Sequence, residues 1–505
     1  MKKIISILLC LAMVTGLLSG CRETSDEVYV PTGDALVMED TPEEELAQDE
    51  EPQKLSMVYY PSQSMNPILC TSYTNRAIFP LLYQSLFVVD RNKEVVPQLC
   101  SSYTVSDDLR TYEFFLDSRA TFSDGTPVTS EDVRASLWDA WDSTYYSGRF
   151  LQVGSLYTAG DNALIINLKQ PCANLPILLD IPIVKAAEVE SDFPLGSGPY
   201  ILSGTEENRF LSRRSNWWCS SKDLLITANR IPLLAAENPT EVRDYFEFYD
   251  AGIVCTDPGS DRYVEYRCDY ELWDCETGLF LYLGFNLNSG LFKDVAVRKA
   301  VLKGIDREKL TDTFYRGFAV PAELPASPKS PYYSRTLAQN YAYNDVEFMN
   351  LMASAGAMGY TVRLLVNSDD SLRARVAKEI SNMLNACGLI VTVVEVGTSE
   401  YRKRLSEGEF EMYLGQTKLS PNMDLTPFFS EGGALSYGGL ADISRYTLCL
   451  QALESESGYY TLHQTVMDQA LICPLLFRSY AVYAARGLLT QLQPARDNLF
   501  FYTIE

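Results

Sequence analysis

The sequence predicts an α/β protein, and the clearest support is a regular alternation of strand and helix patterns after Tyr360. Residues 361–367 (TVRLLVN) suit a strand, and residues 370–388 (DSLRARVAKEISNMLNACG) suit a helix with Gly388 as a typical C-terminal cap. A second strand (LIVTVVEV), a second helix (SEYRKRLSEG) and a third strand (FEMYLGQT) follow. Such a series predicts right-handed crossovers and a parallel sheet.

The bulk composition adds a second observation, because it is that of a large globular protein. The chain has 505 residues, of which 47% are hydrophobic and 21% are charged. This length exceeds what one core usually supports, so two or three domains are expected.

The N-terminus has the pattern of a bacterial lipoprotein signal. Lys2 and Lys3 precede an apolar run, residues 4–18, that is short for a bilayer span, and Leu-Ser-Gly-Cys ends it at Cys21. We therefore expect residues 1–21 to be a signal peptide and Cys21 to carry lipid that holds the protein at the membrane. An ordinary secretory signal with a chance cysteine is the alternative.

An acidic segment, residues 22–54, follows Cys21. It contains twelve acidic residues against Arg22 and Lys54, together with three prolines, which predicts a flexible tether. The whole chain carries a net charge of -24. A surface this acidic repels phosphate backbones, so no nucleic-acid partner is expected.

The stretch FSDGTPVTSEDVRAS, residues 122–136, tests whether a cluster of acids marks an active site. Asp124 and Gly125 suit a tight turn, and Thr129 with Asp132 suits a helix cap close to a capping box. Tyr112, Phe114 and Leu116 alternate in the strand that precedes it. Every acid in the stretch thus has a structural explanation, and we interpret it as a corner between a strand and a helix.

Catalytic and metal-binding signals are weak. The single histidine, His463, lies in an amphipathic helical pattern without a nucleophile motif nearby, which disfavours a serine hydrolase and histidine-rich metal sites. Beyond Cys10 and Cys21, ten cysteines are scattered without a Cys-x-x-Cys pair, so both disulfides and buried free thiols remain open. We expect a binding protein without a cofactor or metal rather than an enzyme.

Several separated blocks resemble the family 5 solute-binding proteins of peptide-type ABC transporters. They are MNP (65–67), LYQSLFVVDRNKEVVPQL (82–99), residues 122–136, SGPYIL (197–202), FNLNSGLFKDVAVRKAVLKGIDREKL (285–310), ACGLIVTV and CPLLF (473–477). The resemblance implies a two-lobed clamshell of the type II, cluster C-like class of periplasmic-binding-protein folds. Lobe 1 is then 55–278, with a subdomain at about 80–187 and a return at 481–505, and lobe 2 is 279–480.

The resemblance also implies function and partners. It implies a monomeric, lipid-anchored receptor on the extracytoplasmic face that binds a peptide or peptide-like solute between its lobes and delivers it to ABC permease subunits. Alternatives are a sensory or regulatory lipoprotein with the same fold, or a binder of another solute such as an oligosaccharide. Turnover of a peptide by the purified protein would support a third alternative, a surface hydrolase.

Candidate ligand-binding residues lie just past the third strand, at the carboxyl edge where parallel sheets bind ligands. Peptide binders of the family hold the ligand's amino group with a Trp-x-x-Asp-Tyr-x-Asp-Pro loop. Here Leu419 replaces the first aspartate, which puts recognition of a free α-amino group in doubt. The candidates are Gln416, Thr417, Lys418, Asn422 and Asp424, together with Asn66 of the first block and Tyr282 near the hinge.

Overall fold

The computed structural model describes residues 55–221, 223–260, 266–288 and 290–504. The predicted signal peptide, Cys21 and acidic tether lie outside these residues. Within them, no helix combines the length and the apolar character that a bilayer span requires. The ten cysteines in the described ranges are free thiols, so of the two alternatives, disulfides and free thiols, the structure shows the second.

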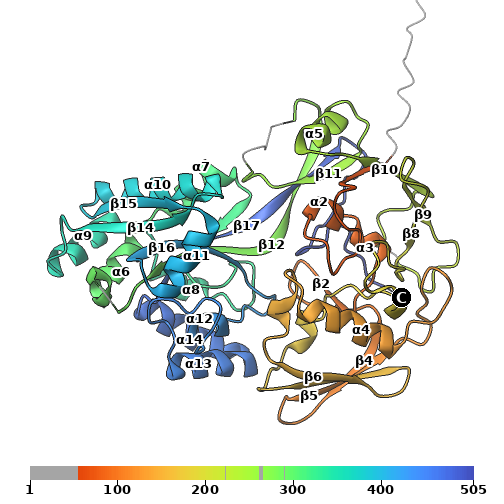
Figure 1. Cartoon of the computed structure of the whole chain (residues 1–505), viewed down its shortest axis with the longest axis horizontal. Helices are drawn as coiled ribbons and strands as arrows, with labels where there is room; N and C mark the ends of the chain where they lie inside the picture. Colours follow the sequence, from red (N-terminus) through yellow and green to blue (C-terminus); the bar gives the residue numbers. More distant parts are fainter. Residues whose placement is uncertain (1–54, 222, 261–265, 289, 505) are drawn as a thin grey trace, which may run out of the picture. The chain divides into compact units, whose positions relative to one another are not determined.

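One large mixed sheet organises the structure (Figure 1). Its strands lie in the order β15 (Ile390–Val396), β14 (Thr361–Asn367), β16 (Met412–Lys418), β12 (Tyr270–Phe285), β17 (Ile472–Ala485), β11 (Ile253–Thr256), β1 (Met57–Tyr59), β10 (Arg230–Ala235), β9 (Phe210–Arg213) and β8 (Tyr200–Ser203), and β13 (Ala319–Pro321) pairs with β17.

Strands β12 and β17 connect two hydrophobic cores. They run antiparallel to each other, and one end of the pair lies beside β11 while the other end lies beside β16. The register shifts between Glu276 and Leu279, and Gly278 has a φ of 72° there. A bulge of this kind bends a strand pair. The chain thus passes between the cores on two long strands.

The two cores define two lobes. The core of the first lobe draws mainly on residues 55–275 and 482–500, and the core of the second lobe draws on residues 280–477. Such an α/β architecture of two lobes is the predicted fold class. The composition of these cores does not locate the lobe boundaries to a residue, so the boundaries at 278/279 and 480/481 stay a prediction.

The second lobe contains the predicted alternation. Strand β14 is followed by α10 (Ser371–Ala386), β15, α11 (Thr398–Glu407) and β16. Strand β14 pairs in parallel with both β15 and β16, and Gly388, just after α10, has a φ of 102°. The predicted parallel unit and its glycine cap are therefore confirmed.

The first lobe contains a separate four-stranded sheet, and the predicted corner lies against it. The strands are β4 (Cys100–Val105), β5 (Thr111–Leu116), β7 (Ala163–Leu168) and β6 (Val153–Thr158), and α4 is Ser130–Trp141. The amide and hydroxyl of Thr129 donate to Asp132 Oδ2 at 2.8 and 2.7 Å, which closes a capping box. The other oxygen of Asp132 accepts from the Ala186 amide at 2.8 Å. The stretch is a corner, as predicted.

Short elements complete the fold. They are β2 (Phe87–Val89), β3 (Val95–Pro97), α2 (Tyr73–Arg76), α3 (Phe79–Leu82), α5 (Pro239–Glu247), α6 (Val295–Lys303), α7 (Arg307–Tyr315), α8 (Arg335–Gln339), α9 (Asp345–Ser354), α12 (Thr426–Phe429), α13 (Ile443–Glu454), α14 (Glu456–Asp468) and 3₁₀ turns at Ser147–Arg149, Leu175–Leu178, Ala186–Glu188 and Gly290–Lys293.

Helix α13 differs from what the sequence predicts, whereas α14 contains the amphipathic pattern around His463. In the sequence, the helical signal between Phe429 and His463 is weak, which predicts a reduced wall of the second lobe there. The structure instead places two helices that pack on each other, with Asp442 capping the first through its side chain. Tertiary packing of Cys449, Ala452 and Leu453 supplies the stability that the local pattern lacks.

Candidate functional site

The predicted segment at the end of β16 lies between the two lobes. Lys418, the last residue of β16, bonds to the first lobe. The Lys418 ammonium donates to Asp497 Oδ1 at 2.8 Å and to the Tyr145 hydroxyl at 2.6 Å, and it lies 3.8 Å from the centre of the Tyr145 ring. Asp497 follows β17 in the first lobe. This ion pair therefore joins segments of opposite lobes.

Burial changes the proton affinity of both partners. Desolvation lowers the pKa of Lys418 to about 7, against the attraction of Asp497. Desolvation alone would raise the pKa of Asp497, but the charges of Lys418 and Arg496 hold it below its ordinary value. Burial and pairing therefore act in opposite directions on Lys418, while pairing prevails for the Asp497 carboxylate.

Asp424 is engaged inside the protein. Its carboxylate accepts from the Thr426 amide at 2.7 Å and from Gln152 Nε2 of the first lobe at 3.3 Å. Desolvation raises its pKa, and the side chain is buried. Asp424 therefore fixes the loop and contacts the opposite lobe, and its oxygens are occupied in this arrangement.

Asn422 also shapes the loop. It is 1% exposed, its Oδ1 accepts from the Ser420 hydroxyl at 2.7 Å, and its carbonyl accepts from the Tyr459 hydroxyl. Binding of a solute by Asn422 or Asp424 stays a prediction, but the contacts seen here are structural.

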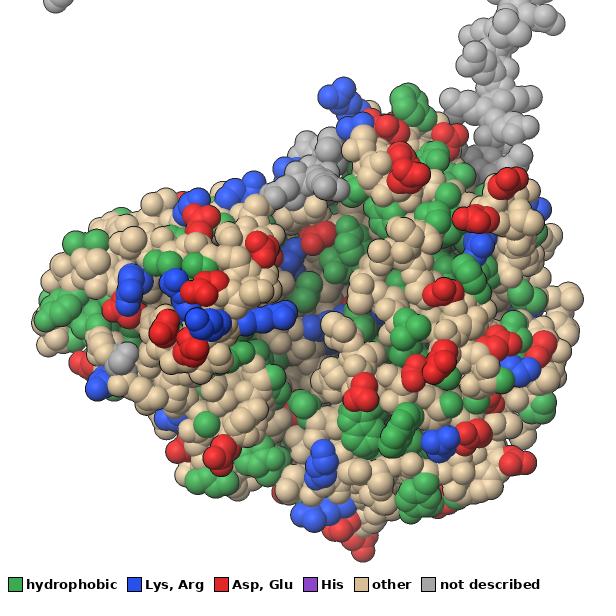
Figure 2. Space-filling view, in the orientation of Figure 1, with side chains coloured by type: hydrophobic (Ala, Val, Ile, Leu, Met, Phe, Trp, Pro, Cys, Tyr) green, Lys and Arg blue, Asp and Glu red, His purple; other side chains and the backbone are tan. Residues whose placement is uncertain are grey.

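Gln416 and Thr417 precede Lys418 at the end of β16. Gln416 Oε1 accepts from Arg478 Nη1 at 3.0 Å, and Arg478 Nη2 also meets both oxygens of Asp257, at 2.7 and 2.8 Å. Thr417 is half-buried and pairs with Phe280 in the sheet. Gln416 is thus linked through Arg478 to the first lobe. Figure 2 shows the hollow in this face above β12 and β17, with charged side chains at its floor.

Tyr282 and Asn66 have different surroundings from those we predicted. Tyr282 is 1% exposed, and its ring lies 5.1 Å from that of Phe428 and 5.9 Å from that of Tyr413, so it belongs to the core of the second lobe rather than to a cleft. Asn66 is fully buried and donates to the carbonyls of Val189 and Ser191 at 2.7 and 2.9 Å. It anchors a loop of the first lobe.

A cavity between the lobes contains residues that the sequence did not single out. Its walls combine apolar side chains, hydroxyls and charged groups: Val89, Lys93, Ile177, Glu276, Gly278, Val320, Ser327, Lys329, Ser330, Pro421, Met423, Phe477, Arg478, Ser479 and Arg496. Both lobes contribute, and the bulge at Gly278 lies in the wall. Apolar walls combined with convergent polar groups are a usual feature of ligand sites.

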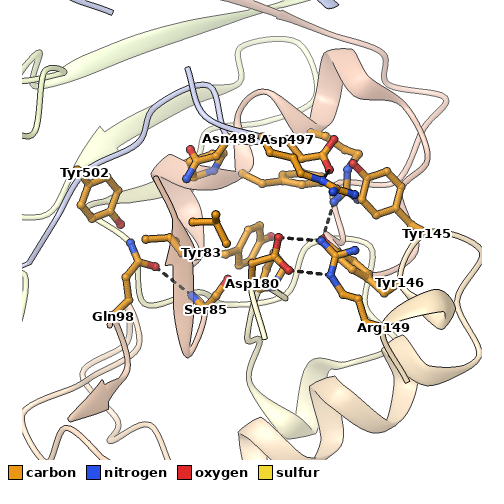
Figure 3. Close-up of a pocket in the computed structure, with 17 residues that line it drawn as sticks. Tyr83, Ser85, Gln98, Tyr145, Tyr146, Arg149, Asp180, Asp497, Asn498 and Tyr502 are labelled. Atoms are coloured by element: carbon orange, nitrogen blue, oxygen red, sulfur yellow. Dashed lines mark hydrogen bonds and ion pairs between the residues drawn. The ribbon is translucent and has the colours of Figure 1, made fainter. Parts of the chain in front are cut away.

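A second cavity in the first lobe adjoins this one, since Arg496 lines both. At one end of it Arg149 meets Asp180 through two bonds of 2.7 Å, with Tyr145, Tyr146 and Asp497 beside them (Figure 3). Sequence reasoning missed this cluster because its members are spread over residues 76–497. The only local signal is a tyrosine pair followed by Arg149.

The described residues offer no group of three or more His, Cys, Asp or Glu side chains placed to hold a metal ion.

Comparison with known proteins identifies relatives of this chain. The sequence model described as "Bacterial extracellular solute-binding proteins, family 5 Middle" matches residues 94–435. The chain is 24% identical over 394 residues to the glutathione-binding protein GsiB of Escherichia coli K12, which covers 73% of this chain and 75% of GsiB.

Solved structures share the fold. HbpA2 from Haemophilus parasuis superposes with a TM-score of 0.74 at 18% identity, covering 90% of this chain and 99% of the other. A putative peptide binding protein, AppA from Clostridium difficile, gives a TM-score of 0.71 at 15% identity, with 90% and 100% covered.

Proposed function

This chain belongs to the bacterial extracellular solute-binding proteins of family 5, and we propose that it binds a peptide or peptide-like solute between its lobes and delivers it to the permease of an ABC importer. The observation that carries this proposal is the cavity lined by both lobes, which the pairs Lys418–Asp497 and Asp424–Gln152 also join. Two relatives have names that point to such ligands: GsiB is named for binding glutathione, and AppA from Clostridium difficile is a putative peptide binding protein.

Lobe closure couples binding to delivery in this proposal. Strands β12 and β17 act as the hinge, with the bulge at Gly278 at the bend and the lobe boundaries near 278/279 and 480/481. A solute that contacts both lobes stabilises the closed form, and a permease distinguishes that form from the open one. The protein acts by binding, as a monomer.

The co-purified ligand tests the function directly. We expect native mass spectrometry of gently purified protein to show a bound species of peptide size, which disappears after unfolding and refolding in clean buffer. The emptied protein should then regain mass and thermal stability with tripeptide pools. A protein that is empty as purified and whose melting temperature no peptide pool raises would contradict the proposal.

We further propose that lipid on Cys21 holds the protein at the extracytoplasmic face of the membrane and that residues 22–54 act as a tether. A receptor that is kept beside its permease does not diffuse away from it. Each buried methylene contributes about 0.8 kcal/mol, so several acyl chains give lasting attachment.

Cys21→Ala should release folded protein into the soluble fraction. The thiol is the predicted acceptor of the lipid, so its loss removes the anchor without changing residues 55–504. Fractionation with circular dichroism of the released protein measures both effects, and Cys70→Ala, within the folded part, is the control that should stay with the membrane. Persistent membrane association of Cys21→Ala would refute the lipid site.

A further inference from the structure

Arg496 has hydrogen-bond donors without a partner among the described residues. It belongs to a cluster of charged side chains whose other members are Arg76, Arg149, Asp180, Lys418 and Asp497. Its side chain is 4% exposed and lines both cavities, and its Nη2 donates to the carbonyl of Leu419. Its Nε and Nη1 have no hydrogen-bond partner in the described part of the chain. Gly278 makes room for the guanidinium, since a Cβ there would overlap Nη2.

The neighbouring cations are already satisfied. Arg149 meets Asp180 in a bidentate pair, Lys418 meets Asp497, and Arg76 donates to the carbonyls of Pro67 and Cys70 at 2.9 Å. The carboxylate nearest to Arg496 is Asp497, whose Oδ2 lies 3.7 Å from Nε. That distance is too long for a hydrogen bond. Four cationic side chains therefore face two carboxylates. Arg496 is within ion-pair distance of Asp497, but its Nε and Nη1 make no hydrogen bond with any described residue.

A buried guanidinium with unused donors is costly, because desolvation of a charge is offset only by a partner. A carboxylate oxygen accepts a charge-assisted hydrogen bond from either free donor, Nε or Nη1, which lie on different edges of the guanidinium. The cavity beside Arg496 also offers the apolar side chains of Val89 and Phe477 and the hydroxyl of Ser327. These groups suit the body of a peptide-like molecule.

The acids around the loop mostly have partners. Asp180 meets Arg149, Asp424 accepts from Thr426 and Gln152, and Asp497 meets Lys418, although Oδ2 of Asp497 has no hydrogen-bond partner among the described residues. Leu419, which follows Lys418, is apolar and offers an amine no charge. Charge in this site thus favours the anionic part of a solute over its cationic part.

We propose that the solute carries a carboxylate that binds Arg496 between the lobes, and that a free amino group is not required. This deepens the proposed function and rests on it. The carboxylate is either the C-terminus of a peptide or an acidic side chain.

Four probes separate these possibilities in binding titrations of the emptied protein. Three are N-acetylated tripeptide pools: free acids without Asp or Glu, the same sequences as C-terminal amides, and amides that contain Glu. An unmodified tripeptide pool is the fourth probe. We expect the acetylated free acids to bind at least tenfold more tightly than the neutral amides. Tight binding of the Glu amides as well would assign the site to either carboxylate.

The outcomes distinguish failure of the carboxylate site from failure of the proposed function. Equal affinity for all three acetylated pools, the free acids, the neutral amides and the Glu amides, would overturn the carboxylate site and leave the proposed function intact. Tight binding of unmodified peptides alone would also overturn it, because the amino group would then be essential. No binding of any pool would instead contradict the proposed function.

Arg496→Gln should reduce the preference for acids over amides to less than twofold, because it removes the charge and keeps an amide donor. Arg363→Gln is the matched control on the exposed surface of the second lobe, where 65% of the side chain is accessible, and it should keep the full preference. Circular dichroism checks the fold of both variants. If Arg496→Gln does not fold, the acid and amide titrations of the unmodified protein decide alone.

Discussion

Replacing Asp180 by alanine should destabilise the protein by about 3–5 kcal/mol, because it leaves Arg149 buried without its partner. The two side chains are 4% and 12% exposed and share two hydrogen bonds of 2.7 Å. Arg149 also lies 4.9 Å from the centre of the Tyr146 ring, but an aromatic face does not replace a carboxylate. Urea unfolding at pH 7.5 measures the loss.

A double-mutant cycle isolates the pair. Asp180→Ala combined with Arg149→Met should cost clearly less than the sum of the single changes, since the remaining charge is removed as well. The ion pair Arg363–Glu411 is the control, because Arg363 is largely exposed and Arg363→Ala should cost less than about 1 kcal/mol. An Asp180→Ala effect as small as the control would show that the pair is not buried in solution.

Replacing His463 by leucine should make the protein more resistant to acid. His463 is fully buried in α14, neither ring nitrogen has a hydrogen-bond partner among the described residues, and burial lowers its pKa to about 3. The unfolded chain has a histidine pKa of about 6.5, so protons bind the unfolded state more strongly. The stability from this group is complete above pH 6.5 and is lost as the pH falls towards 3.

The expected size follows from about 1.4 kcal/mol per pH unit. Between pH 7 and pH 5, the free energy of unfolding of His463→Leu should rise by about 2 kcal/mol relative to the unmodified protein. His463→Phe should give the same slope, which controls for the fit of the new side chain. This is the single histidine of the chain, so no other imidazole contributes. Parallel pH profiles of variant and parent would refute the burial of a neutral ring.

Much of the fold could be predicted because its signals are local. The alternation of β14, α10, β15, α11 and β16 follows from hydrophobic periodicity, and the cap at Thr129 and Asp132 needs only residues three apart. Helix α13 shows the limit, since packing stabilises it more than its own pattern does.

The site could be predicted only in part. The position of the loop after β16 follows from the rule that ligands bind at the carboxyl ends of parallel strands. The same rule does not predict which groups the side chains of this loop contact. For Tyr282, the aromatic pattern of the sequence is the same whether the ring faces a core or a cleft.

The sequence by itself determined the α/β class, the alternating unit, the corner at residues 122–136 and the departure at Leu419, because each depends on residues close together in the chain. Only the tertiary structure decided that Lys418 meets Asp497, that Arg478 meets Asp257 and that Arg496 keeps unused donors. These groups are separated by 79 and 221 residues, and no periodicity encodes such contacts. They exist because two long strands bring the lobes together, and burial then makes each unpaired charge matter.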